Sequence, residues 1–303
     1  MSHTILYADD TTLVFPTSPS NIESCFQTIN REISKVSDWL KANKLCINSK
    51  KSRYMVFHYN QRTFDYDNFP PLYIDNSAIE RTSEFNFLGL IIHETLNWKA
   101  HIAYISTKMS RATGCLKRLQ NTVPSHVLKA IYNSLILPHL NYCILAWGST
   151  ISRVFKLQKK AIRIINNQKY NSHTDPLYKG NKMLKLSDIY TLKALKFHYQ
   201  YTHNNVPFYF RNIFAPNTNP NPYDTRFRHR ERPQIPHHSS SSNTLRYKIP
   251  KIVSSMHSSV TDKVGSHSYE GFSYYVKQYL ISLYNENCTI HNCYICNPPL
   301  PVT

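Results

Sequence analysis

Apolar and β-prone residues in the first third of the chain come in short runs, as strands do. Residues 5–15 hold two such runs on either side of the acidic pair Asp9 and Asp10. This pattern predicts a strand, a tight turn and a returning strand, with both carboxylates at the tip of the hairpin. Three further runs predict more strands, at residues 53–58, 72–74 and 87–92.

Segments with the apolar spacing of helices lie between these runs and, from Trp98 onward, follow them. Ser20 with Glu23 forms a capping-box pattern, and the helix that it predicts has the apolar stripe Ile22, Phe26, Ile29, Ile33, Val36 and Leu40. From Trp98 onward a second stripe repeats at three and four residues, namely Ile102, Ile105, Met109, Ala112, Leu116 and Leu119. Pro124 then opens a segment with Val127, Ile131 and Leu135 on one side.

Three later segments also have helical spacing. Residues 153–166 predict a helix with one apolar side and the five cations Arg153, Lys156, Lys159, Lys160 and Arg163. Such a face either contacts phosphates or is simply solvated. Ser187 predicts the cap of a helix that runs to about His203, and residues 269–285 predict a last amphipathic helix. Residues 216–268 are rich in Pro, Asn, Ser, His and Arg, which predicts a mobile basic segment.

These patterns predict an α+β fold, in which an antiparallel sheet with a packed helix precedes mainly α-helical regions. We expect four parts. Residues 1–95 contain the sheet, residues 96–210 are helical, residues 211–268 are basic and flexible, and residues 269–303 hold the last helix with a group of Cys and His residues.

The charge balance points to a partner. The chain has 36 Lys and Arg against 18 Asp and Glu, a net charge of +18, and 15 His can add charge near phosphates. A polyanion is the expected partner, with a merely soluble basic protein as the alternative. No apolar run approaches the ~20 residues of a membrane-spanning helix, and no signal peptide opens the chain. We therefore expect an intracellular protein of the nucleus or cytoplasm, without a membrane partner.

Seven cysteines fall at irregular positions. Four of them stand singly inside apolar patterns, as buried free thiols do: Cys25, Cys46, Cys115 and Cys143. Near the C-terminus lies a tight group made of Cys288, His291, Cys293 and Cys296. Four such ligands can close a zinc site, but this spacing is tighter than that of two separated ligand pairs, which favours free thiols.

Asp9 and Asp10 are the candidate catalytic residues. Nucleotidyl transfer by two divalent metals needs carboxylates at a rigid turn, and Mg²⁺ or Mn²⁺ prefers oxygen ligands of this kind. Asp and Thr are also ordinary turn residues, so the pair alone is a weak signal.

A series of further motifs strengthens the signal of the Asp9–Asp10 pair. After Tyr7-Ala8-Asp9-Asp10 come residues 39–48, Lys51-Ser52 with Met55-Val56-Phe57, and Phe87-Leu88-Gly89-Leu90. Leu96-Asn97-Trp98 with His101 and Lys108, Tyr142-Cys143 with Ala146-Trp147-Gly148, and residues 157–163 follow. Over nearly all of residues 5–170 this series resembles the reverse transcriptases of non-LTR retrotransposons, of the LINE type and jockey-like. The resemblance implies RNA-directed DNA polymerase activity, with part of a palm in residues 1–95 and a thumb after it.

The resemblance also implies roles for single residues. Asp9 matches a metal ligand and Asp10 its supporting carboxylate, while Lys51 either assists the leaving pyrophosphate or is a surface lysine. Tyr7 and the primer-grip turn Phe87, Leu88 and Gly89 would lie at the primer, and phosphate contacts would come from Lys108, Lys159, Lys160 and Arg163. The implied partners are an RNA template, a DNA primer, their RNA:DNA hybrid and deoxynucleotides, with Mg²⁺ or Mn²⁺ as the cofactor.

Two palm motifs of the family precede the Tyr-Ala-Asp-Asp turn, one of them with a further metal-binding aspartate. Only six residues precede Tyr7, and we do not expect Asp65, Asp67 or Asp75 to replace that aspartate. The sequence thus predicts an N-terminally truncated fragment that starts at the Tyr-Ala-Asp-Asp motif and is inactive alone. The alternative is a non-catalytic nucleic-acid-binding protein derived from the element. An unrelated helical interaction protein would require the order of motifs to be accidental.

Overall fold

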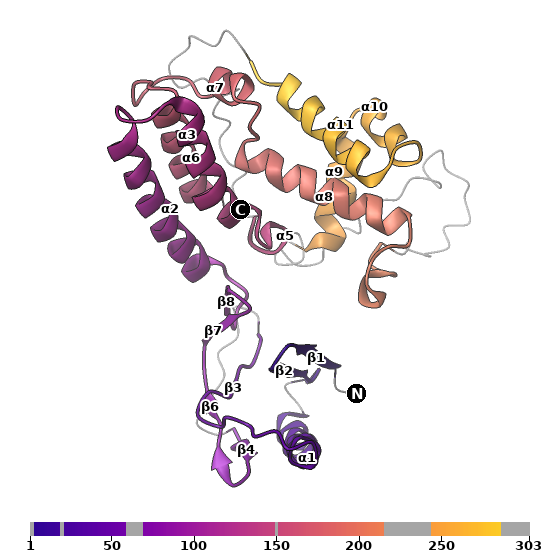
Figure 1. The fold of residues 1–303 in the computed structure, drawn as a ribbon. Coiled ribbons are helices and arrows are strands. Elements are labelled where there is room, and N and C mark those ends of the chain that lie inside the picture. Colours follow the sequence, from indigo (N-terminus) through magenta and orange to yellow (C-terminus); the bar gives the residue numbers. More distant parts are fainter. Residues whose placement is uncertain (1–2, 19–20, 59–68, 149–150, 215–243, 286–303) are drawn as a thin grey trace, which may run out of the picture. The chain divides into compact units, whose positions relative to one another are not determined.

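The computed structural model describes residues 3–18, 21–58, 69–148, 151–214 and 244–285. The chain divides into two compact units, Met1–Trp98 and Lys99–Thr303, which we name unit 1 and unit 2 and describe separately (Figure 1). Strands occur in unit 1 and most helices in unit 2, as an α+β chain requires.

The described part of unit 1 contains four separate pairs of short strands. β1 (His3–Tyr7) and β2 (Asp10–Val14) form the antiparallel hairpin that the alternating pattern predicts. β4 (Tyr73–Ile74) with β5 (Ser77–Ala78), and β7 (Glu84–Phe87) with β8 (Leu90–His93), are also antiparallel. β3 (Arg53–Tyr54) pairs in parallel with β6 (Glu80–Arg81).

The prediction of one antiparallel sheet is therefore wrong for the described residues. Residues 87–92 are not one strand, because the chain reverses at Leu88 and Gly89, whose φ angles are 48° and 85°. Two positive φ values are typical of the two-residue hairpin turn of type I′. An apolar pattern of period two cannot reveal such a reversal, because it depends on backbone angles at two residues.

The helix α1 (Ile22–Ala42) follows the predicted apolar stripe. Its N-cap is Asn21, which makes no side-chain cap hydrogen bond, so the predicted cap at Ser20 is wrong by one position. Of the stripe only Phe26 is buried, and its ring meets those of Tyr54 and Phe69 edge-on at 5.9 and 5.5 Å.

The core of unit 1 is small. Among its described apolar side chains only Phe26, Leu72 and Ile74 are buried. Ten large hydrophobic side chains are exposed: Ile5, Leu6, Tyr7, Val14, Trp39, Leu45, Phe57, Tyr73, Phe85 and Leu96. Burial of apolar area is the main stabilising contribution to a fold, so unit 1 gains little from its own core.

The first part of unit 2 is a group of three packed helices, α2 (Lys99–Leu119), α3 (Ser125–Leu135) and α6 (Ser152–Ile165). The stripe predicted for α2 is buried up to Leu116. On α3 the prediction is wrong, because Leu128 and Tyr132 are buried whereas Leu135 is 47% exposed. Val127, Ile131 and Leu135 lie on one face of this helix, and Leu128 with Tyr132 on the neighbouring face. Apolar spacing alone cannot show which of the two faces is buried.

The second part of unit 2 centres on α8 (Leu186–Thr202), which packs against both α9 (Leu245–Ser255) and α11 (Tyr269–Ser282), as Figure 1 shows. The N-cap of α8 is Lys185, not the predicted Ser187. Shorter elements complete the unit: α4 (Leu137–Asn141), α5 (Ile144–Trp147), α7 (Asp175–Gly180), α10 (Ser258–Thr261), and the 3-10 helices η3 (Phe208–Phe210) and η5 (Asp262–Val264).

Helices α9 and α10 lie where the sequence predicts no regular element. Ile249 and Val260 are fully buried, so both helices are docked. The apolar spacing of α9 is easy to miss because Pro250 stands inside the helix. Residues 215–243 of the predicted basic segment lie outside the described residues.

Two further predictions concern single features. Cys25, Cys46, Cys115 and Cys143 are free, but Cys46 and Cys143 are exposed and the other two are half-buried, so the prediction of buried thiols is wrong. The group at Cys288, His291, Cys293 and Cys296 lies outside the described residues. None of the helices that the structure describes is long and apolar enough to cross a membrane.

Candidate functional site

The β1–β2 hairpin places the two candidate carboxylates at consecutive positions, Asp9 in its turn and Asp10 at the start of β2. Tyr7 pairs with Asp10, which leaves Ala8 and Asp9 as the two residues of the turn. Ala8 has a φ of 51°, in the left-handed region that favours glycine. A positive φ at the first turn residue alone is the pattern of a type II′ turn. The sequence thus correctly predicts the hairpin, but Asp10 is the first strand residue and not part of its tip.

Both carboxylates are exposed, and so is the ring of Tyr7, at 62%. Exposed carboxylates keep their oxygens accessible to a divalent cation, and none of the ion pairs among the described residues involves Asp9 or Asp10. Among the described residues, however, no three Asp, Glu, His or Cys side chains come together as a metal-binding group. The described residues thus show two exposed carboxylates at the hairpin and no complete metal-binding group.

Asp75 does not extend this set. Its carboxylate accepts hydrogen bonds from Ser37 Oγ at 2.7 Å and from Lys41 Nζ at 2.6 Å. The hydrogen bond from Lys41, followed by that from Ser37, lowers the pKa of Asp75. Asp75 thus joins the β4–β5 turn to α1. Asp65 and Asp67 lie outside the described residues.

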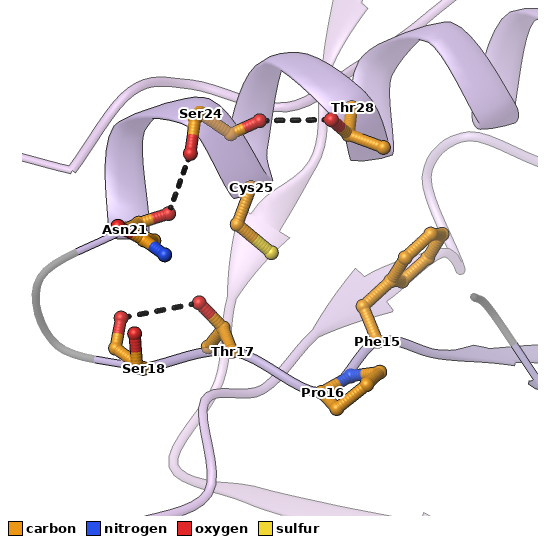
Figure 2. Close-up of a pocket in the computed structure, with 8 residues that line it drawn as sticks. All are labelled: Phe15, Pro16, Thr17, Ser18, Asn21, Ser24, Cys25 and Thr28. Carbon is orange, nitrogen blue, oxygen red and sulfur yellow. Dashed lines mark hydrogen bonds between the residues drawn. The ribbon is translucent and has the colours of Figure 1, made fainter.

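A pocket of about 400 Å³ lies where the chain leaves the hairpin and enters α1 (Figure 2). Its wall consists of Phe15, Pro16, Thr17, Ser18, Asn21, Ser24, Cys25 and Thr28. The hydroxyls of this wall satisfy local backbone carbonyls, for example Ser24 Oγ to Asn21 O at 3.1 Å and Thr28 Oγ1 to Ser24 O at 2.9 Å. The pocket contains none of the predicted site residues, so we do not assign the chemistry to it.

Four other predicted residues of unit 1 lie in or next to turns. Lys51 is exposed and follows α1, where its backbone N–H donates to Asn48 O at 3.0 Å. Phe87, Leu88 and Gly89 form the end of β7 and its turn to β8. Gly89 has a positive φ, a conformation that glycine adopts without strain.

The cations of α6 divide into two groups. Arg153, Lys156 and Lys160 are exposed and repeat at three and four residues, which places them on one face of the helix. Lys159, by contrast, holds its ammonium 4.4 Å from the centre of the Phe155 ring.

Arg163 and Lys108 also have intramolecular partners. Arg163 is half-buried, its Nε donates to Ser172 O at 2.8 Å, and burial lowers its pKa. On α2, Lys108 lies 5.5 Å from the centre of the Tyr104 ring. The resemblance assigns phosphate contact on α6 to Lys159, Lys160 and Arg163, but of these only Lys160 is exposed, together with Arg153 and Lys156.

The excess of positive charge belongs to unit 2. Unit 1 contains 9 Lys and Arg against 11 Asp and Glu, whereas unit 2 contains 27 against 7. Between Glu94 and Asp175 the sequence has no acidic residue at all. This stretch includes α2, α3 and α6, so its exposed cations face no acidic neighbours along the chain.

Gln158 is fully buried, although no sequence pattern singles it out as a functional residue. Its Nε2 donates to Tyr132 Oη at 2.9 Å and to Leu184 O at 3.0 Å, and its Oε1 accepts from Leu186 N at 2.9 Å. One side chain therefore joins α6 to α3 and to the start of α8. A polar residue on the apolar side of a helix was the available signal.

A buried ion pair lies next to it. Lys185 Nζ bonds to Asp175 Oδ2 at 2.7 Å and lies 4.4 Å from the centre of the Tyr284 ring. The hydroxyl of Tyr284 donates to Asp188, whose pKa burial raises. These contacts attach the residue Tyr284, just after α11, to α7 and α8, and they give the buried Lys185 ammonium a charged partner.

Comparison with known proteins gives two curated relatives. A probable RNA-directed DNA polymerase from the transposon X-element of Drosophila melanogaster is 24% identical over 172 residues, which are 54% of this chain and 18% of the relative. The RNA-directed DNA polymerase from the mobile element jockey of Drosophila funebris is 22% identical over 200 residues, 63% of this chain and 21% of the relative. The chain is similar to retrotransposon RNA-directed DNA polymerases.

The similarity to these reverse transcriptases confirms the resemblance that the motif series indicates. It is partial in both directions, since the chain spans about a fifth of the length of the curated relatives that it matches. No protein-family profile matches the chain. No solved structure matches it either.

Proposed function

We propose that the chain is part of a retrotransposon reverse transcriptase, with a portion of the polymerase palm in unit 1 and the thumb in the first helices of unit 2. The observation that carries the proposal is the Tyr7–Asp10 hairpin, which exposes one carboxylate in a turn with a left-handed residue, Ala8, and a second at the first residue of β2. The similarity to two RNA-directed DNA polymerases supports it. Tyr7 and the Leu88–Gly89 turn then lie on the primer side.

In this proposal Asp9 is a ligand for Mg²⁺ or Mn²⁺ and Asp10 supports it. Divalent ions bound there would activate the 3′ hydroxyl of the primer and hold the triphosphate of the incoming deoxynucleotide. The described residues supply two carboxylates, fewer oxygen ligands than a two-metal centre needs. We therefore infer that the chain does not extend a primer alone, and that the polymerase completes the site with residues outside the described ones.

Unit 2 holds the template-primer in this proposal. Lys108 on α2 and the exposed face of Arg153, Lys156 and Lys160 on α6 contact phosphates of an RNA:DNA hybrid. Phosphate contacts by Lys and Arg release counterions, so affinity falls steeply with salt. Lys159 and Arg163 contribute less, because each already has a partner within the fold.

Hybrid binding tests the nucleic-acid part of the proposal. Fluorescence anisotropy with a labelled RNA:DNA hybrid is expected to give a logarithmic salt slope of about −0.9 per phosphate contact. Lys156→Glu with Lys160→Glu is expected to weaken binding about tenfold or more, whereas Lys182→Glu, an exposed lysine beyond α6, changes it little. Equal effects of both variants would contradict the assignment to α6.

Primer extension with an RNA template, a DNA primer and Mg²⁺ or Mn²⁺ tests the catalytic part. We expect no extension by the chain alone. Extension that Asp9→Ala abolishes would overturn the inferred inactivity and confirm the role of Asp9.

The second candidate is a non-catalytic nucleic-acid-binding protein, which the charge of unit 2 alone would satisfy. Mn²⁺ binding, followed by electron paramagnetic resonance, separates the two without requiring activity. A reverse transcriptase portion is expected to bind Mn²⁺ weakly and to lose it in the Asp9→Asn and Asp10→Asn variants. Equal Mn²⁺ binding by the parent and these variants favours the second candidate.

A further inference from the structure

The 3-10 helix η3 exposes two aromatic rings in sequence. The side chains of Phe208 and Tyr209 are 75% and 68% exposed, and their ring centres lie 6.0 Å apart. Large rings in a helical unit are normally buried, since exposing them forfeits hydrophobic stabilisation. Two adjacent exposed rings on one short turn therefore need an explanation.

The fold fixes this turn in place. Val206, just before it, is 7% exposed, and the Phe210 ring meets that of Phe197 on α8 edge-on at 5.4 Å. Pro207 precedes the turn, and its carbonyl accepts a hydrogen bond from Phe210 N at 2.9 Å. Residues on either side of the two rings are thus held by the fold, while Phe208 and Tyr209 themselves are exposed.

Positive charge accompanies the rings. The Arg211 guanidinium carbon lies 5.8 Å from the centre of the Phe208 ring, and Arg211 is exposed. The sequence has no Asp or Glu between Asp188 and Asp224. Exposed rings beside a cation are what an unpaired nucleotide requires, because its base stacks on a ring while its phosphate meets the cation.

We propose that Phe208, Tyr209 and Arg211 form a binding site for single-stranded nucleic acid, separate from the hybrid surface on α2 and α6. The bases of an unpaired strand stack on the two rings, and Arg211 binds the backbone. Stacking of this kind accepts any base, so the site takes RNA or DNA without reading its sequence. The proposal rests on the proposed function only in taking nucleic acid as the partner of unit 2.

Anisotropy with two probes tests the site in the full chain: a labelled oligouridine of about 20 nucleotides and an RNA:DNA hybrid of equal length. The Phe208→Ala/Tyr209→Ala variant is expected to bind oligouridine about tenfold more weakly or worse, and the hybrid within about twofold of the parent. Tyr170→Ala is the matched control, because Tyr170 is 91% exposed elsewhere in unit 2. Phe208→Trp/Tyr209→Trp keeps stacking surfaces and is expected to retain binding, which excludes a mere folding defect.

The outcomes distinguish this site from the proposed function. Loss of oligouridine binding in the alanine variant, with no hybrid binding by any variant, supports the stacking site and contradicts the template-primer proposal. Hybrid binding with oligouridine binding unchanged in the alanine variant overturns the stacking site alone, and assigns the rings to another role such as contact with a protein. Failure of the parent chain to bind oligouridine also overturns it.

Discussion

Gln158 provides the sharpest test of how unit 2 is held together. Replacing it with Leu removes three hydrogen bonds and leaves Tyr132 Oη, Leu184 O and Leu186 N without this partner. Each buried polar group that loses its partner costs about 1–3 kcal/mol. The apolar leucine regains part of this by burial, so we expect a net loss of roughly 3–5 kcal/mol in the free energy of unfolding.

This loss is a large fraction of the roughly 5–15 kcal/mol that stabilises an ordinary domain. For a unit of this size about 1 kcal/mol shifts the midpoint of thermal unfolding by ~2–4 °C, so the midpoint is expected to fall by roughly 10 °C. Denaturation by urea, followed by far-ultraviolet circular dichroism, measures the change directly. Lys156→Leu is the matched control, because Lys156 lies on the exposed face of the same helix and should change stability by less than about 0.5 kcal/mol.

A loss below about 1 kcal/mol in Gln158→Leu would refute the reasoning, since it would mean that the three partners find other hydrogen bonds at no cost. Equal losses in Gln158→Leu and Lys156→Leu would refute it too. They would indicate that any leucine on α6 disturbs the helix, whatever its burial.

Three further outcomes are expected. Ala8→Gly relieves the steric strain of the left-handed backbone at the hairpin turn, where Ala8 has a φ of 51°. The β1–β2 amides should then gain about 1 kcal/mol of protection in hydrogen exchange. Unchanged exchange would contradict this backbone conformation. Burial lowers the pKa of His101 below its ordinary 6.5, so the unfolded state binds a proton more readily than the folded state. The protein should therefore lose stability as the pH falls through 6.5. His101→Gln should flatten this loss between about pH 7.5 and 5.5, as measured by urea denaturation. Unit 1 expressed alone should bind a hydrophobic dye and unfold without a sharp transition, because so few of its described apolar residues are buried. Cooperative unfolding would show that its core is sufficient for a stable fold.

The sequence predicted best those features whose causes are local. The β1–β2 hairpin, α1, α2 and α11 each follow from a pattern within a few residues of chain. The α3 face could not be predicted, because its choice depends on which neighbouring helix covers Leu128 and Tyr132. The pairing of β3 with β6 depends on residues far apart in sequence, and apolar spacing does not contain that information.

The candidate site divides in the same way. The carboxylates and their hairpin were predictable, because an acidic pair between two β-prone runs is typical of a hairpin turn. The partners of Lys159 and Arg163 were not, because Phe155 and Ser172 are ordinary residues until the fold brings them into contact. A charge run therefore predicts that a helix is basic, but not which of its cations remain available to a ligand.

This division changes how residues 157–163 should be understood. Within them Gln158 joins three segments, Lys159 covers a ring and Arg163 donates to a loop carbonyl, so most of the polar side chains stabilise unit 2. Only Lys160 joins the exposed face with Arg153 and Lys156, two cations that precede the motif. A segment that resembles a family motif can therefore stabilise the fold as much as contact a ligand. The proposed phosphate contacts should then be tested along the exposed face of α6, and residues 157–163 should be tested by stability as well as by binding.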